Sequence, residues 1–189
     1  MPLATKKYIE EEIVRNISLG DKKAFKELYQ LYYNRLCQFA LLFFHSKELS
    51  EEVVSDVFLN VWIKRDRLVP ERNIRSFLYT SVRHRAIDLL RTNSIHPKNN
   101  INVYELELES PEPSVDDTID REQFRERLQK AFDKLPEQCR IAARMHFNDQ
   151  LSYKEIAVIL GISYKTVKAQ IAIATKKVKE TFKKNGWDK

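Results

Sequence analysis

The sequence predicts an all-α protein made of two small helical domains joined by an acidic linker. Only three glycines and six prolines occur in 189 residues, so the turn-rich pattern of a β fold is missing. Apolar residues instead recur at intervals of three and four over long segments, which is the helical period. This pattern lapses once, over residues 93–118, where three of the six prolines and a cluster of acidic residues lie.

The first predicted domain, residues 1–92, contains three long amphipathic segments. Helices are expected over residues 21–45, 50–63 and 74–91. Asp21 is placed to cap the first of them, and Pro70 marks a break between the second and the third. We expect their apolar stripes to form one core, with these core positions in the third helix: Phe77, Leu78, Val82, Ile87 and Leu90.

The second predicted domain, residues 119–189, contains a helix-turn-helix pattern. Ser152 and Glu155 have the spacing of a capping box for its first helix. Gly161 stands where that helix must end and the chain must turn, and Ser163 is placed to cap the second helix. The combination is a stronger signal than any one of these residues alone.

The second helix of this pattern divides into two faces. Val167, Ile171, Ala174 and Val178 follow steps of four, three and four, which is typical of a core stripe. Lysines on the other side can neutralise phosphates or donate to guanine, and small apolar side chains can meet a thymine methyl group. The candidate DNA-binding residues are Tyr164, Lys165, Lys168, Ala169, Ala172 and Lys176.

Charge is distributed unevenly along the chain. Residues 1–98 carry 17 basic and 12 acidic side chains, a net charge of +5. Residues 99–120 carry no basic and seven acidic side chains (−7), and residues 121–189 carry 16 basic and eight acidic side chains (+8). Two basic domains with an acidic connector are typical of nucleic-acid binding, although a well-solvated helical surface has the same signature.

Two further surfaces are predicted in the first domain. Between Lys64 and Arg91 there are eight basic and three acidic side chains, interleaved with Phe77 and Tyr79, a composition that suits single-stranded DNA. Phe77 is expected in the core, so the candidates for DNA are Arg75, Tyr79, Arg83 and Arg85. Outside its apolar stripe, the 50–63 helix has a candidate docking surface that consists of Glu52, Ser55, Asp56 and Leu59. The alternative is that these exposed residues only keep the protein soluble.

Two blocks of the chain resemble the extracytoplasmic-function sigma factors of bacterial RNA polymerase. Residues 121–183, with the run from Leu135 to Arg140 ahead of the helix-turn-helix, are similar to the domain that reads the −35 promoter element. Residues 21–92 are similar to the N-terminal domain. There, residues 51–62 correspond to the helix that docks on the β′ clamp, and residues 74–91 to the part that melts and reads the −10 element.

The resemblance assigns roles to two more features. At His84 the family often has asparagine, in the region that helps to hold a flipped −10 base, so His84 joins the −10 candidates with an altered hydrogen-bond geometry. The acidic linker would thread toward the polymerase active centre, although an ordinary tether is an equal alternative; its acidic residues include Glu105, Glu107, Glu109, Glu112, Asp116 and Asp117.

The resemblance implies core RNA polymerase, promoter DNA and an anti-sigma factor as partners, with polymerase supplying all catalysis. No metal and no cofactor is expected, because the four histidines have no metal-ligand spacing and no common catalytic motif is present. Cys37 and Cys139 read as reduced core residues of a cytoplasmic protein, and the apolar run 39–44 is too short to insert into a membrane. The alternative is a stand-alone helix-turn-helix transcriptional regulator.

Overall fold

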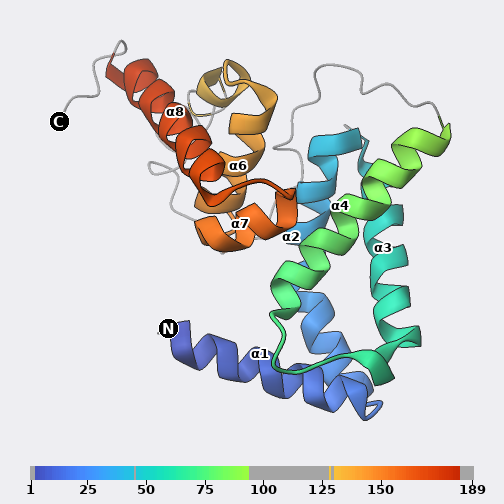
Figure 1. Cartoon of the computed structure of the whole chain (residues 1–189). Helices are drawn as coiled ribbons and strands as arrows, with labels where there is room; N and C mark the ends of the chain where they lie inside the picture. Colours follow the sequence, from blue (N-terminus) through green and yellow to red (C-terminus); the bar gives the residue numbers. More distant parts are fainter. Residues whose placement is uncertain (1–2, 45, 94–127, 129, 184–189) are drawn as a thin grey trace, which may run out of the picture. The chain divides into compact units, whose positions relative to one another are not determined.

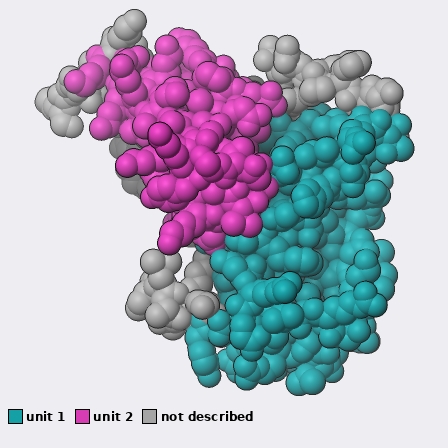
Figure 2. Space-filling view, in the orientation of Figure 1, with its two compact units in different colours: residues 1–107 teal, residues 108–189 magenta. Residues whose placement is uncertain are grey.

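The computed structural model describes residues 3–44, 46–93, 128 and 130–183. All regular elements within these residues are helical, and they contain no strand, so the all-α prediction is confirmed (Figure 1). The chain forms two compact units, residues 1–107 and 108–189 (Figure 2). The acidic residues predicted in the linker lie outside the described residues.

Unit 1 is a bundle in which α2 contacts α1, α3 and α4. Its elements are α1 (Leu3–Ser18), α2 (Lys22–Phe44), α3 (Lys47–Ile63), the short 3-10 helix η1 (Arg65–Arg67) and α4 (Ile74–Asn93). Leu28 and Leu36 of α2 are fully buried together with Val54 of α3 and Leu78 of α4. One apolar core therefore joins all three predicted helices.

The starts of α2 and α3 follow from their capping residues. Asp21 Oδ1 accepts a hydrogen bond from the Lys23 amide at 2.7 Å, which confirms the predicted cap. The prediction that the next helix begins near Ser50 was wrong, because Ser46 caps it by accepting from the Leu49 amide. The buried Ser50 hydroxyl donates instead to the Ser46 carbonyl at 2.6 Å, one turn inside the helix.

Helix α1 had no counterpart among the predicted helices. Its buried residues are Ile13, Val14 and Ile17 in its second half, and the half-buried Ile9 continues the same spacing of four. The Tyr32 hydroxyl donates a hydrogen bond to the Glu10 carboxylate and so joins α1 to α2. Burial, together with this bond, raises the pKa of Tyr32 above its usual value.

Unit 2 contains the predicted helix-turn-helix. Its described helices are α6 (Glu137–Phe147), α7 (Tyr153–Leu160) and α8 (Tyr164–Lys183). The capping box is confirmed, because Ser152 Oγ accepts from the Glu155 amide while the Glu155 carboxylate accepts from the Ser152 amide at 2.8 Å. Gly161 ends α7 with φ of 66°, in the left-handed region that favours glycine.

Helices α7 and α8 together contain an apolar stretch, and they are joined at a sharp bend. Among the described residues no single helix is long and apolar enough to span a membrane; only α7 and α8 taken together have the length and composition, and they meet at a bend of 110°.

Both cysteines are buried free thiols, as predicted. Burial raises the pKa of the Cys37 thiol to about 12 and also raises the pKa of Cys139. Neither side chain is therefore a reactive thiolate near neutral pH.

Gly161→Ala should destabilise the helix-turn-helix through backbone strain alone. An added Cβ would meet no atom within 4 Å, so the cost arises from the positive φ and should be about 1 kcal/mol. Native-state hydrogen exchange of the α7 and α8 amides measures this free energy of opening. The matched variant Gly161→Asn should lose less, since asparagine tolerates this conformation; equal losses for both variants would contradict the explanation.

Candidate nucleic-acid and partner interfaces

Helix α8 presents the predicted DNA-binding face to solvent. Ser163 Oγ accepts from the Thr166 amide at 3.0 Å and starts the helix where predicted. Val167, Ile171 and Ala174 are buried and fix the rotation of the helix. All six predicted residues are exposed: Tyr164, Lys165, Lys168, Ala169, Ala172 and Lys176.

The same face continues to Lys179, which sequence reasoning missed. Lys179 is exposed and follows Lys176 by three residues, so the two side chains are neighbours on the helix surface. The helical period that placed Lys176 would have placed Lys179 as well. The face therefore carries four lysines around two alanines, a composition suited to phosphates flanking a groove.

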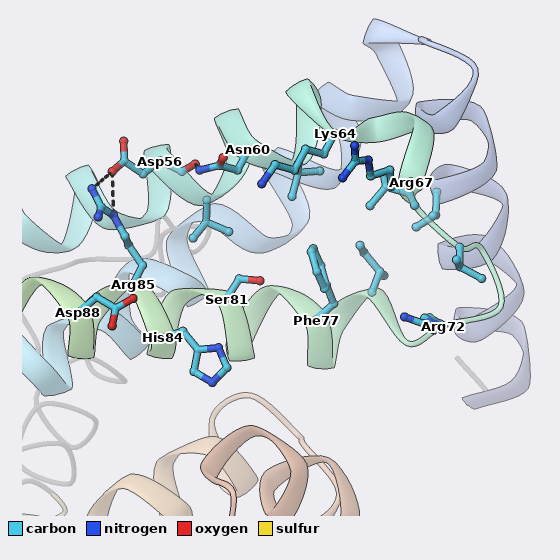
Figure 3. A pocket seen from close by; sticks show the side chains of 16 residues that line it. Asp56, Asn60, Lys64, Arg67, Arg72, Phe77, Ser81, His84, Arg85 and Asp88 are labelled. Atoms are coloured by element: carbon cyan, nitrogen blue, oxygen red, sulfur yellow. Dashed lines mark hydrogen bonds and ion pairs between the residues drawn. The ribbon is translucent and has the colours of Figure 1, made fainter.

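Unit 1 contains a pocket of about 600 Å³ between α3 and α4, which is also lined by Val14 of α1 and by residues of the segment 64–72 (Figure 3). Phe77 projects from α4 toward α3, and its ring is 47% exposed. Four cationic side chains line the pocket: Lys64, Arg67, Arg72 and Arg85. The apolar wall consists of Val14, Val57, Val61, Leu68, Val69 and Ile74.

Two of the predicted DNA contacts are wrong in this structure, because the helical register turns them inward. Tyr79 is fully buried and packs with its ring centroid 5.0 Å from that of Phe39. Arg75 is only 7% exposed, and its positive charge acts on the buried Tyr32. The prediction for Phe77 is reversed as well, since this ring lies at the pocket and not in the core.

The remaining −10 candidates lie at or near the surface of α4. His84 and Arg85 are exposed and line the pocket, and Arg83 is half-buried. Arg85 also forms an ion pair across the helices, donating from Nη2 and Nε to Asp56 Oδ2 at 2.7 and 3.0 Å. One predicted DNA residue thus contacts one predicted docking residue, which sequence reasoning did not foresee.

The predicted docking face of α3 is on the surface. Glu52 and Ser55 are exposed, Leu59 is 57% exposed, and Asp56 is half-buried beside Arg85. Ile63, one turn beyond Leu59, is 59% exposed and extends the apolar part of this face. The spacing of four from Leu59 would have included it.

Not every basic residue of this region faces the pocket. The Arg65 guanidinium lies 4.8 Å from the centre of the Trp62 ring and donates to the Trp62 carbonyl at 2.9 Å. This cation–π contact holds Arg65 against α3. Only the structure could separate it from Lys64 and Arg67, its neighbours along the chain.

No described group of three or more His, Cys, Asp or Glu side chains is arranged to hold a metal ion.

Comparison with known proteins identifies the family. Residues 28–95 match the model of sigma-70 region 2, and residues 125–178 match the model of sigma-70 region 4. The first match covers α3, α4 and every pocket-lining residue except Val14, and the second covers the helix-turn-helix. The chain is an extracytoplasmic-function sigma factor. A stand-alone helix-turn-helix regulator is not favoured.

Several relatives span nearly the whole of this sigma factor. The RNA polymerase sigma factor RpoE of Cereibacter sphaeroides is 27% identical, covering 85% of this chain and 87% of its own length. The ferric citrate uptake sigma factor FecI of Escherichia coli is 29% identical over 79% of this chain and 86% of its own length. CnrH, solved in complex with the cytosolic domain of CnrY, has the same fold, with a TM-score of 0.61 and 20% identity over 94% of this chain and 99% of that one. Members of this family are transcription initiation factors and not enzymes in the usual sense.

The reversed positions of Phe77 and Tyr79 can be tested by stability. Tyr79→Ala should lower the free energy of unfolding of unit 1 by about 3–5 kcal/mol, because it leaves a cavity beside Phe39. Phe77→Ala removes a half-exposed ring and should cost about 1 kcal/mol or less. Urea titration followed by tryptophan fluorescence compares the two variants. A larger loss for Phe77→Ala would contradict the placement of both rings.

Proposed function

We propose that this sigma factor divides promoter recognition between its two units, with α8 reading −35 duplex DNA and the α3–α4 pocket capturing the melted −10 strand. The proposed domains are residues 1–92 and 119–189, with residues 93–118 as their linker. The observation that carries the proposal is that each unit has its own exposed basic surface, and that the one in unit 1 contains a pocket lined by cationic side chains and by the half-exposed Phe77 ring.

The surface of α8 suits duplex DNA. It is a row of exposed lysines and alanines on a capped helix, with the exposed Tyr164 in the first turn. Such a helix fits the major groove, where Lys165 and Lys168 near its N-terminus are placed to reach base edges or phosphates. Lys176 and Lys179, farther along, are placed to contact the backbone.

The pocket of unit 1 suits an unpaired nucleotide. Its volume of about 600 Å³ is sufficient for a base, and the Phe77 ring offers a face for stacking. Lys64, Arg67 and Arg72 at the η1 side supply positive charge for the flanking phosphates. His84 adds a side chain that can both donate and accept hydrogen bonds.

The exposed face of α3 is the proposed contact with the β′ clamp of core RNA polymerase. Glu52, Ser55 and Asp56 present polar and acidic groups, and Leu59 and Ile63 present adjoining apolar area. An interface core of apolar residues with charged residues at its rim is typical of a specific protein contact. Polymerase then supplies all catalysis, and the sigma factor acts in the cytoplasm.

An anti-sigma factor is the proposed regulatory partner. RpoE of Bartonella quintana, solved in complex with the anti-sigma factor NepR, shares this fold with a TM-score of 0.61, at 20% identity over 88% of this chain and 99% of that one. A partner that covers the α3 face or the pocket would prevent polymerase or DNA from binding there.

The proposed function predicts a stable complex with bacterial core RNA polymerase and new, discrete start sites when transcripts are made from fragmented genomic DNA of the source organism. Sequencing of those transcripts also yields the promoter elements. Core polymerase without the protein is the control. Tight duplex binding by the protein alone, without a polymerase complex, would instead support a self-sufficient regulator.

Lys168→Ala should weaken binding of the polymerase complex to promoter duplex. If Lys168 contacts a phosphate, the slope of log affinity against log salt should fall by about 0.9, the value for one phosphate on duplex DNA. If it contacts a base, sequence preference should relax at one −35 position. Lys154→Ala, an exposed lysine on α7 outside the α8 face, is the matched control. No change in either quantity would remove Lys168 from the interface.

A further inference from the structure

The ion pair between Asp56 and Arg85 joins the two proposed interfaces of unit 1. Asp56 belongs to the α3 face and also lines the edge of the α3–α4 pocket, whose wall includes Arg85. Two donor atoms of the guanidinium, Nε and Nη2, point at the single oxygen Oδ2, at 3.0 and 2.7 Å (Figure 3). The Asp56 side chain is 35% exposed and the Arg85 side chain is 46% exposed, so both remain accessible to a partner.

Each member of the pair occupies the group that the other would offer to its ligand. While Asp56 accepts from Arg85, that oxygen is not available to a cationic group of polymerase. While Arg85 donates to Asp56, its charge is largely neutralised and two of its five N–H groups are directed away from a phosphate. The contact therefore opposes both binding events in the free protein.

Resting on the proposed function, we infer that Asp56 and Arg85 form an exchangeable contact that couples polymerase docking to strand capture. When polymerase engages Asp56, Arg85 is released to a phosphate of the strand in the pocket. When the strand engages Arg85, Asp56 is released to polymerase. Asp56 thus acts on DNA indirectly, by masking Arg85 until polymerase binds, in addition to its own proposed role in docking.

Thermodynamic linkage fixes the sign and the size of the effect. Removing either member frees the other, so each substitution should strengthen the binding event in which the deleted residue takes no part. The gain cannot exceed the strength of the pair itself. For a partly exposed ion pair we expect about a two- to fivefold increase in affinity.

The first arm measures affinity of the full-length protein for core RNA polymerase. Arg85→Ala should bind about two- to fivefold more tightly than the parent protein. Arg91→Ala removes an equal charge from an exposed position of α4 that lines no pocket, and it should leave the affinity unchanged. An unchanged or weakened affinity for Arg85→Ala would overturn the inference.

The second arm measures affinity of the full-length protein, without polymerase, for a fluorescent single-stranded DNA of mixed sequence. Asp56→Asn should bind about two- to fivefold more tightly, because the positive charge of Arg85 is no longer masked. Glu51→Gln removes a charge from the same helix at a residue paired with Lys47, and it corrects for net charge. Weaker binding by Asp56→Asn would mean that the carboxylate orients Arg85 for DNA and would overturn the exchange.

The double variant Asp56→Asn with Arg85→Ala tests whether the gain in DNA affinity depends on Arg85. It should lose that gain, since the released group is absent. The losses expected of the two single variants separate this inference from the proposed function. If Asp56→Asn fails to weaken polymerase binding, or Arg85→Ala fails to weaken strand binding, the proposed interfaces are wrong. If both weaken as expected but neither gain occurs, the interfaces stand and only the exchange is wrong.

Discussion

Burial of one face of α4 is the constraint on which the arrangement of unit 1 depends. Leu78, Tyr79, Val82 and Ala86 are all fully buried against the neighbouring helices. A helix has 3.6 residues per turn, so anchoring these four leaves Phe77, His84 and Arg85 on the other sides. The rotation chosen by the core therefore decides which side chains can meet DNA, and it excludes Tyr79 despite its aromatic ring.

The packing of α3 against α2 and α4 has a second consequence. With Val54, Val57, Phe58 and Val61 turned inward, the outer side of α3 is a strip of exposed and half-buried side chains. One edge of that strip, at Asp56, lies within hydrogen-bonding distance of Arg85 on α4. The proposed docking surface and the proposed nucleic-acid pocket are neighbours because α3 and α4 share one core.

Unit 2 is organised differently, through local interactions at the ends of its helices. Capping by Ser152 and Ser163, and the left-handed Gly161 between them, set the angle at which α8 leaves α7. The buried stripe at Val167 and Ile171 then sets the rotation of α8. These interactions involve residues close together in the chain, which is why the exposed face of α8 followed from the helical period.

The sequence by itself determined the helical class, the capped helix-turn-helix and the family resemblance, because these depend on local spacing. Only the tertiary structure decided the burial of Arg75 and Tyr79, the exposure of Phe77 and the pairing of Asp56 with Arg85. Helix α1 was not predicted, although Ile9, Ile13 and Ile17 follow the helical period. Helix α4 carries apolar and basic side chains on several sides, so its buried side depends on contacts with α2 and α3, which are distant in the chain.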